Sequence, residues 1–389
     1  MRIARRELLA AALLVPTAAI AGKARFDIPA IERRRVIPRA LALLDAMPRT
    51  IAAIPAPRSP GGRQDYYSEG DYWWPDPKNP GGPYIRRDGR SNPDKFDGHR
   101  DALIAFGRIV PMLAVAWKLT GEARFATAAM RHLHTWFVDP ATRMNPHLNH
   151  SQAVIGVNTG RAIGVIDTLQ IIEVARAATL FAERRAPSYA RIRAGVEDWF
   201  ARYLDWLTTS PFGVAERDEK NNHGSCWLLQ AAAFASATRH TATLDAARTR
   251  LKTTLIPTQI APNGRQPLEL ARTKPYAYSL FNLDVLTTSA WLLSQRDGDL
   301  IGWRTPDGRS IAGAIAFMAP YIADKRKWPF ARDIEYFDDF PVRHPALLFG
   351  GIAAKRPDWT ALWQRLDADP VVPEVVRNFP VRQPLLWLD

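Results

Sequence analysis

One cysteine, Cys226, is present among 389 residues. A lone cysteine cannot form a disulfide bond within the chain, so such cross-links cannot stabilise the fold. Acidic residues are also few relative to basic ones: 39 Asp and Glu accompany 52 Lys and Arg, which gives a formal net charge of +13. The chain must therefore rely on a large hydrophobic core, and its positive charge indicates an anionic partner.

Beyond the N-terminus no stretch reaches the roughly 20 uninterrupted apolar residues that a membrane helix needs. Arg5-Arg6 precede an apolar run from Leu8 to Leu14, and Ala19-Ile20-Ala21 follows as a small-x-small cleavage pattern. This order is typical of an export signal peptide, and the paired arginines favour the twin-arginine route; an uncleaved first helix is the alternative. We predict that residues 1–21 are removed and that residues 22–389, with a net charge of +11, are periplasmic or secreted without a stable membrane anchor.

Motifs of several other protein classes are missing. The sequence has no zinc-finger spacing, basic heptad region or long Lys/Arg block, so nucleic acid is not the expected partner. It also lacks a Gly-rich phosphate loop and a nucleophile-elbow pattern. Outside the cytoplasm the usual anionic partners are acidic polysaccharides and lipid headgroups, so we expect a partner of one of these two kinds.

Helical periodicity dominates the rest of the chain, and β-branched alternation is almost absent. No Gly/Ser linker divides the interior, so we expect one domain, acting as a monomer. Many antiparallel helices without a short exact repeat favour an all-α fold in which paired helices close into an α/α toroid, with a non-toroidal helical array as the alternative. The predicted helices are 100–118, 122–137, 158–181, 187–207, 224–238, 242–253, 280–295, 308–322, 343–354 and 358–366, preceded by one or two helices within 28–54.

Residues 55–97 are rich in proline and glycine and are predicted to form a long ordered loop. Loops of this length inside a domain are often functional. The loop contains Tyr67, Trp73-Trp74 and Arg86-Arg87, which suit stacking on sugar rings and binding of carboxylates. Because side chains alternate along an extended segment, we expect one tryptophan to pack and the other to line a cleft.

Two polar motifs precede apolar helices. Asn222-His223 stands directly before the run Trp227–Phe234, and Arg272 and Tyr278 stand before a second such run. Polar groups at the mouths of buried helices are more typical of a site than of a folding requirement. An isolated histidine or tyrosine at such a position, however, is more often a cap or a satisfied core residue.

Four motifs in order carry a resemblance to a known family. The motifs are Tyr66–Pro77, Asn145–His150, Lys220–Gly224, and Glu269–Arg272 followed by Tyr278–Phe281. They resemble the alginate-lyase domain family of bacterial polysaccharide lyases, and most of all polysaccharide lyase family thirty-eight, which includes alginate and glucuronan lyases. The resemblance runs from about residue 35 to the C-terminus. It implies an incomplete α/α toroid and β-elimination on a uronate polymer, without a metal ion or another cofactor.

Such an elimination removes the proton at C5 of a 4-linked uronate and expels O4. Negative charge builds up beside a carboxylate, so the site needs hydrogen-bond donors, a base and an acid. With the family match, Tyr278 is predicted to be both base and acid, and Arg272 is predicted to stabilise its phenolate, since a free phenol has a pKa of about 10. Tyr276 is the alternative proton carrier.

The set of residues that neutralises the substrate carboxylate has two candidates for its asparagine. His223 is predicted to donate to the substrate carboxylate or to share the base role, and either Asn149 or Asn222 completes the set. His147 and His150 flank Asn149 and are predicted to bind substrate, because the sequence offers no cysteine partner or His-Glu-x-x-His helix for a metal site.

Two alternative functions are consistent with the sequence. The acidic cluster Asp333, Glu335, Asp338 and Asp339 would serve a glycoside hydrolase acting on uronic acid oligosaccharides. A non-catalytic uronan-binding protein would keep the aromatic loop and the positive charge. The identity of the uronic acid and the endo or exo mode of action stay open.

Overall fold

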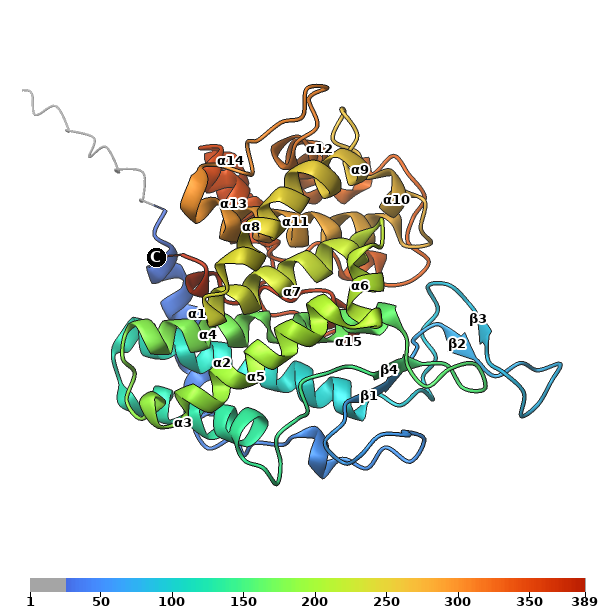
Figure 1. The fold of residues 1–389 in the computed structure, drawn as a ribbon. Coiled ribbons are helices and arrows are strands. Elements are labelled where there is room, and N and C mark those ends of the chain that lie inside the picture. Colours follow the sequence, from blue (N-terminus) through green and yellow to red (C-terminus); the bar gives the residue numbers. More distant parts are fainter. Residues whose placement is uncertain (1–25, 389) are drawn as a thin grey trace, which may run out of the picture.

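The computed structural model describes residues 26–388 and is built mainly from helices (Figure 1). The predicted export signal, residues 1–21, lies outside the described residues. The helices are α1 Ile28–Ala42, α2 Gly98–Thr120, α3 Ala123–Leu133, α4 Ile172–Glu183, α5 Tyr189–Thr209, α6 Pro211–Arg217, α7 Asn222–Thr238, α8 Thr241–Arg250, α9 Ile256–Gln259, α10 Pro267–Leu270, α11 Pro275–Asp297, α12 Ile311–Ala323, α13 Pro345–Ala353, α14 Pro357–Arg365 and α15 Pro373–Arg377. The short strands are β1 Tyr67–Glu69, β2 Trp73–Trp74, β3 Ile85–Arg86 and β4 His150–Ala153.

Helix α7 is the centre of the helical body, where it packs against α4, α5, α8 and α11. Its residues from Gly224 to Ala235 are all buried, because small and apolar side chains cover every face of the helix. Helix α5 instead buries one face, with Trp199 and Tyr203, and exposes Arg202 on the other. Helix α7 is thus an inner helix and α5 an outer one, and the predicted all-α toroidal class is confirmed.

Helix α2 is the one helix among residues 26–388 that is long and apolar enough to cross a membrane by length and composition. Most of its apolar window is buried, and the helix packs against α1, α3 and α4. A core helix passes the same test, so this finding is weak evidence for a membrane span.

The segment predicted as one long helix over 158–181 forms two different elements. Residues Ala162–Ile171 make a 3-10 helix, and the α-helix α4 begins only at Ile172. A Cβ on Gly164 would lie 2.6 Å from the backbone oxygen of Ser151, so β4 approaches the start of this segment too closely for a regular helix with side chains.

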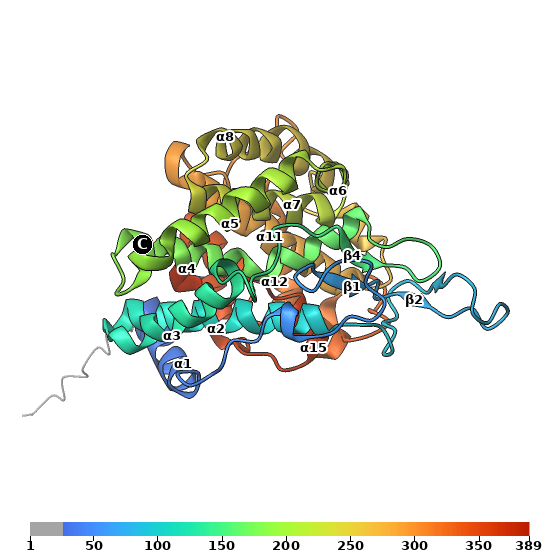
Figure 2. The same ribbon diagram turned by 60° about the horizontal axis from the view of Figure 1, so that its bottom comes forward.

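The Pro/Gly-rich loop is ordered by short strands that the sequence did not predict. β1 pairs in parallel with β4, and β2 pairs with β3 in antiparallel fashion. In Figure 1 β2 and β3 project from the side of the helical body, and Figure 2 shows β2 in the same extension. The pairing of β1 with β4 fixes the turn between β1 and β2 against the ends of the core helices.

Candidate active site

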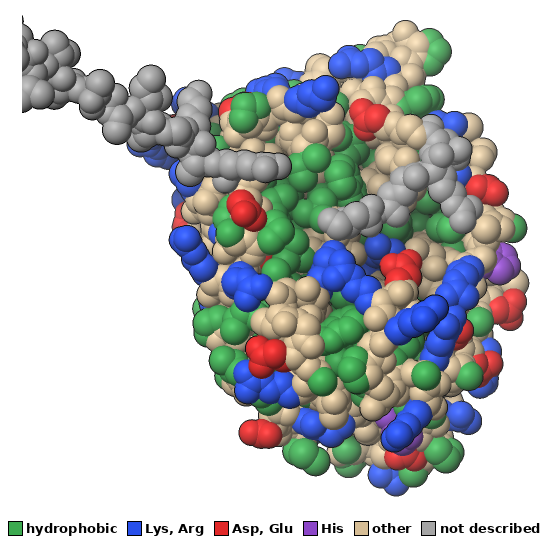
Figure 3. Space-filling view, turned by 90° about the vertical axis from the view of Figure 1, so that its left-hand side faces the viewer, with side chains coloured by type: hydrophobic (Ala, Val, Ile, Leu, Met, Phe, Trp, Pro, Cys, Tyr) green, Lys and Arg blue, Asp and Glu red, His purple; other side chains and the backbone are tan. Residues whose placement is uncertain are grey.

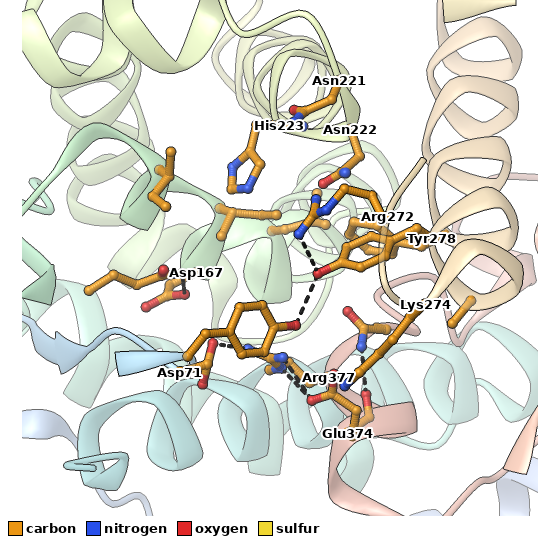
Figure 4. Close-up of a pocket in the computed structure, with 18 of the residues that line it drawn as sticks. Asp71, Asp167, Asn221, Asn222, His223, Arg272, Lys274, Tyr278, Glu374 and Arg377 are labelled. Carbon is orange, nitrogen blue, oxygen red and sulfur yellow. Dashed lines mark hydrogen bonds and ion pairs between the residues drawn. The ribbon is translucent and has the colours of Figure 1, made fainter. Parts of the chain in front are cut away.

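A cavity of about 270 Å³ lies where the first residues of α2, α7 and α11 meet the β1–β2 turn and α15. Figure 4 shows Asn222, His223, Arg272 and Tyr278 on one wall, and Asp71, Glu374 and Arg377 on the facing wall. The N-terminus of an α-helix carries a partial positive charge. Several such termini at one cavity favour an anionic ligand.

The start of α7 places Asn222 and His223 at the cavity. Asn221 caps the helix, and its side-chain oxygen accepts a hydrogen bond from the His223 backbone N–H at 3.0 Å. A Cβ on Gly224 would lie 2.2 Å from the backbone oxygen of Glu219, so only glycine lets the preceding loop pack this closely. The predicted polar pair at the mouth of a buried helix is therefore confirmed.

The side chain of His223 is positioned by a buried carboxylate. Its Nδ1 lies 2.8 Å from Oε1 of Glu216, a residue at the end of α6 whose side chain is completely buried. Burial lowers the pKa of His223, but the Glu216 carboxylate outweighs this effect, so the pKa is raised above its ordinary value. The Glu216 carboxylate thus stabilises the charged form of the imidazole, which has a second N–H to donate.

Asn222 is oriented by a second buried carboxylate, Glu269 of α10. One Glu269 oxygen accepts from the Asn222 backbone N–H at 2.7 Å and the other from Asn222 Nδ2 at 2.8 Å. Burial raises the pKa of Glu269, and the bonds from Asn222 partly offset that rise. This double contact fixes which end of the amide is nitrogen and leaves its second N–H available as a donor.

Tyr278 lies in the first turn of α11, and its hydroxyl contacts two polar groups. Arg272 Nη2 donates to it at 3.0 Å, and the Tyr72 hydroxyl lies 3.0 Å away. The Arg272 guanidinium also stacks 4.1 Å from the centre of the Tyr278 ring. The contact that the predicted role of Arg272 requires is therefore present.

The predicted effect of Arg272 on the acidity of Tyr278 is only partly right. Burial raises the pKa of the Tyr278 phenol above its ordinary value, while Arg272 and Tyr72 lower it by a smaller amount. The phenol is thus protonated in the free protein at neutral pH. Two donors aimed at one oxygen still stabilise the phenolate once it forms.

The facing wall comes from the β1–β2 turn and the C-terminal part of the chain. Arg100 Nη1 donates to Asp71 Oδ1 at 2.7 Å, and Arg377 bonds the other Asp71 oxygen. Burial raises the pKa of Asp71, but Arg100 and Arg377 outweigh burial and hold it well below its usual range. Arg377 also pairs with Glu374 of the same helix at 2.7 Å, and its bond to Asp71 ties α15 to the turn that carries Tyr72.

Among the predicted substrate contacts, Trp73 and Arg86 line the cavity but Trp74 and Arg87 do not. The Trp74 indole donates to the backbone oxygen of Arg90 at 3.0 Å, and the Arg87 guanidinium lies 5.0 Å over the Trp74 ring. The expected division of roles between the two tryptophans is confirmed, and it places Trp73 at the site.

Two tyrosines predicted at the site are core residues. The Tyr67 hydroxyl donates to Glu69 at 2.8 Å, and its side chain is buried. The Tyr276 ring packs against Trp328 and Phe337, and its hydroxyl donates to the backbone oxygen of Tyr321 at 3.1 Å. Neither lines the cavity. On α11 the cavity is lined by Ala277, Tyr278 and Phe281, whereas Tyr276 points into the core.

The motif Asn145–His150 lies outside the cavity. Asn149 is exposed and accepts a hydrogen bond from the Trp206 indole at 3.0 Å, while His147 lies 3.1 Å from Asp65. His150 opens β4, where its backbone pairs with Tyr67. The structure therefore brings Asn222, and not Asn149, together with His223, Arg272 and Tyr278.

The acidic cluster that would serve a hydrolase has structural partners instead. The Asp333 carboxylate accepts from the backbone N–H groups of Tyr276 at 2.8 Å and Ala277 at 2.9 Å, so it caps α11. Glu335 pairs with Lys274 at 3.2 Å. None of the cluster's carboxylates lines the cavity, and the hydrolase alternative loses its proposed acid and base.

The sequence reasoning missed several residues that line or support the cavity. Tyr72 and Lys274 belong to segments that were singled out, yet their side chains had no assigned role. Arg161 and Arg377 carried no signal, because neither stands in a recognisable motif and each reaches the cavity only through tertiary folding. Within residues 26–388 no group of three or more His, Cys, Asp and Glu side chains is placed to hold a metal ion.

Helices arranged as an incomplete toroid, with helix N-termini and a buried tyrosine at a cavity rich in arginine, define a class of polysaccharide lyases. Comparison with solved structures supports this class. An alginate lyase from Bacteroides ovatus is 30% identical, with a TM-score of 0.79, over 92% of this chain and 94% of its own. A variant of alginate lyase A1-III from Sphingomonas species A1, in its apo form, shares the fold at 17% identity, with a TM-score of 0.53 over 82% of this chain and 84% of its own.

The profile of the alginate-lyase family matches residues 50–328. The chain therefore belongs to the alginate-lyase family and is a polysaccharide lyase. No protein of curated function matches it in sequence.

Proposed function

We propose that this protein cleaves a 4-linked anionic uronan by β-elimination, with alginate or polymannuronate as the first candidate substrate and β-1,4-glucuronan as the second. The observation that carries the proposal is the Tyr278 hydroxyl, which receives a hydrogen bond from Arg272 at 3.0 Å in the cavity that Asn222 and His223 also line. Membership of the alginate-lyase family and similarity to the alginate lyase from Bacteroides ovatus support the choice of substrate.

Neutralisation of the substrate carboxylate is the first requirement of the reaction. His223, whose pKa the Glu216 carboxylate raises, and the free N–H of Asn222, oriented by Glu269, provide two donors. The Arg272 guanidinium adds a positive charge beside them. Side chains alone thus supply the donors that an enolate-like intermediate at C5, C6 and the carboxylate oxygens needs.

Proton transfer is assigned to Tyr278. Its phenolate, stabilised by Arg272 and Tyr72, takes the proton from C5, and the electron pair of that bond forms the C4–C5 double bond. The bond from C4 to O4 breaks, and the new phenol returns its proton to O4. One residue therefore serves as base and then as acid, which requires both events on the same face of the sugar.

The branch assignment is a finer proposal. We place the chain in polysaccharide lyase family thirty-eight, on the four motifs that the sequence carries in order. A substrate panel of polymannuronate, polyguluronate and polyglucuronate tests both the branch and the uronate preference, because that branch includes alginate and glucuronan lyases.

The experiment that tests the function is incubation of residues 22–389 with each polymer while ultraviolet absorbance of a 4,5-unsaturated product is followed. A rise in absorbance on at least one uronan is expected. Reducing ends that accumulate without absorbance would mean hydrolysis, and retardation in a polymer-containing gel without either product would mean binding alone. Both of these outcomes contradict the proposal.

A further inference from the structure

The basic residues of the cavity differ in how their charges are balanced. Of the six Lys and Arg side chains among the described residues that line it, five have a carboxylate within ion-pair distance. The five pairs are Arg86 with Asp88, Arg100 with Asp71, Arg272 with Asp88, Lys274 with Glu335, and Arg377 with Glu374. Arg161 is the exception, because no Asp or Glu within residues 26–388 forms an ion pair with it. A partly buried cation of this kind favours an anion that enters the cavity.

Arg161 is nevertheless held in place. Its Nε donates to the backbone oxygen of Gln152 at 2.8 Å, and its Nη2 donates to Gln152 Oε1 at 3.2 Å. The guanidinium lies 5.5 Å over the ring of Trp73, which also lines the cavity. The remaining terminal nitrogen, Nη1, has no hydrogen-bond partner within the described part of the chain. A fixed guanidinium with a free nitrogen is ready to bind a carboxylate.

The backbone around Arg161 is adapted to this arrangement. Gln152 has a φ of 48°, a left-handed conformation that costs a non-glycine residue free energy and that is found mainly where a site requires it. A Cβ on Gly70 would lie 2.7 Å from Arg161 Nη2 and 2.7 Å from Trp73 Cδ1. Glycine at this position therefore lets the guanidinium and the indole approach each other.

We infer that Arg161 and Trp73 form a second uronate subsite, in which Arg161 binds the carboxylate of a sugar adjacent to the one that loses its C5 proton. The inference rests on the proposed function, because a uronan carries one carboxylate on every sugar. Asn222, His223 and Arg272 take the first carboxylate, and Arg161 is the remaining cavity cation free to take another. The Trp73 ring offers a stacking surface for the same sugar.

The charge of Arg161 is maintained in the free protein. Burial lowers the pKa of Arg161 to about 10, so the guanidinium is still protonated at neutral pH. A bound carboxylate would compensate part of the lost solvation. The subsite therefore selects polymers in which neighbouring sugars are both charged.

The test compares Arg161→Gln with wild type on a polyuronate and on the same polymer with part of its carboxylates reduced to alcohols. We expect Arg161→Gln to raise KM on the fully charged polymer about ten- to hundredfold, the loss typical of a charge-assisted hydrogen bond, with kcat changed much less. Wild type should prefer the fully charged polymer, and the variant should lose most of that preference. Arg161→Lys, which keeps the charge but not the planar fork, should fall between them.

Arg356→Gln is the matched control, because Arg356 also lies over a tryptophan, 4.5 Å from the ring of Trp359, but outside the cavity. Its KM should equal that of wild type. Gly70→Ala is a second variant that keeps the charge of Arg161 and displaces it, and KM should rise there too. Thermal unfolding of each variant shows whether the chain is folded.

An Arg161→Gln protein that is folded and has wild-type KM and wild-type preference would overturn the inference. Failure of the proposed function looks different: wild type itself would then give no unsaturated product on any uronan. In that case calorimetric titration with a uronate oligosaccharide decides, since weaker binding by Arg161→Gln than by Arg356→Gln supports the subsite and equal binding rejects it.

Discussion

The Tyr278 hydroxyl accepts a hydrogen bond from Arg272 while a second hydroxyl, that of Tyr72, lies equally close. Because burial raises the pKa of the Tyr278 phenol, the phenolate is a minor species that these two donors make accessible. Removing only the hydroxyl therefore separates proton transfer from binding, since the ring that stacks on Arg272 stays.

Tyr278→Phe should lower kcat by roughly 10²- to 10⁴-fold, the usual contribution of a positioned acid or base, with polymer binding nearly unchanged. Product absorbance measures the first quantity and gel retardation the second. Tyr189→Phe, which removes a hydroxyl from a buried tyrosine outside the cavity, should retain wild-type activity. Appreciable turnover by Tyr278→Phe would move the proton-carrying role to His223.

Glu216→Gln should change the pH profile through His223. In the proposed mechanism His223 acts protonated and Tyr278 acts deprotonated, and the pKa of Tyr278 is the higher one. The value of kcat/KM then rises with pH up to the pKa of His223, is level between the two pKa values, and falls above that of Tyr278. The Glu216 carboxylate raises the pKa of His223. Without it, the level region should begin at lower pH, and kcat/KM in that region should fall about tenfold for each unit by which the pKa of His223 drops.

The control for this profile is Glu219→Gln, which removes a carboxylate near His223 that makes no hydrogen bond to it among the described residues. Its effect should have the same direction and be smaller. If folded Glu216→Gln protein has the same plot of kcat/KM against pH as wild type, His223 does not act in its protonated form.

At the scale of elements, the two motifs that define the site depend on contacts between helices. Glu269 of α10 joins the first residue of α7 through two hydrogen bonds, so α10 orients the start of the central helix. α10 has only four residues and cannot be stable alone. Its position comes from α11, against which it packs.

Glu269→Ala should destabilise the protein by about 1–3 kcal/mol, because two buried donors of Asn222 lose their acceptor. Denaturant unfolding measures the change, and kcat should fall as well because Asn222 is no longer oriented. Glu197→Ala removes an acid that forms a partly exposed ion pair with Arg193 on α5, and it should cost less than about 1 kcal/mol. Equal stability of the two variants would contradict the structural role assigned to Glu269.

Long apolar helices were predictable from the sequence, and short or irregular elements were not. α2 carries apolar residues at helical spacing and α7 is an almost continuous apolar run, and both appear close to their predicted bounds. α15 has five residues and no periodic signal, although Arg377 at its end lines the cavity. The four strands are two to four residues long, too short for alternation to reveal them.

The candidate site was predictable where a motif and a helix start coincide. Asn222, His223, Arg272 and Tyr278 fulfil this condition, and the structure brings them together. Asn149 and Tyr276 stand in or beside equally specific motifs, yet one bonds Trp206 at the surface and the other packs in the core. A motif shows that a segment matters, but the direction of each side chain is decided by tertiary packing.

At the scale of the whole molecule, the excess of positive charge is not confined to the cavity. Figure 3 shows Lys and Arg side chains spread over the side of the helical body away from β2 and β3, with fewer Asp and Glu between them. A basic surface attracts a polyanion over distances of about a Debye length, roughly 8–10 Å at physiological salt. The cavity then selects among the polyanions that arrive.

A basic surface of this kind is suited to a compartment where acidic polysaccharides are accessible, and we propose that the protein is exported through the twin-arginine route. Arg5→Lys and Arg6→Lys together keep the charge of the N-terminus but remove the arginine pair. We expect wild type in the periplasm with its chain starting after Ala21, and the double variant as full-length protein in the cytoplasm. Cell fractionation shows the compartment of each protein, and N-terminal sequencing shows the residue at which its chain starts.

The matched control for export is Arg33→Lys with Arg34→Lys, an exposed arginine pair on α1. This variant should be exported and cleaved like wild type, because the pair lies beyond the signal. Equal export of the Arg5/Arg6 variant would exclude the twin-arginine route while leaving the signal itself in place. A chain that keeps residues 1–21 in the periplasm would instead show an uncleaved helix, and a chain never exported would remove the reason for expecting a polysaccharide outside the cytoplasm as substrate.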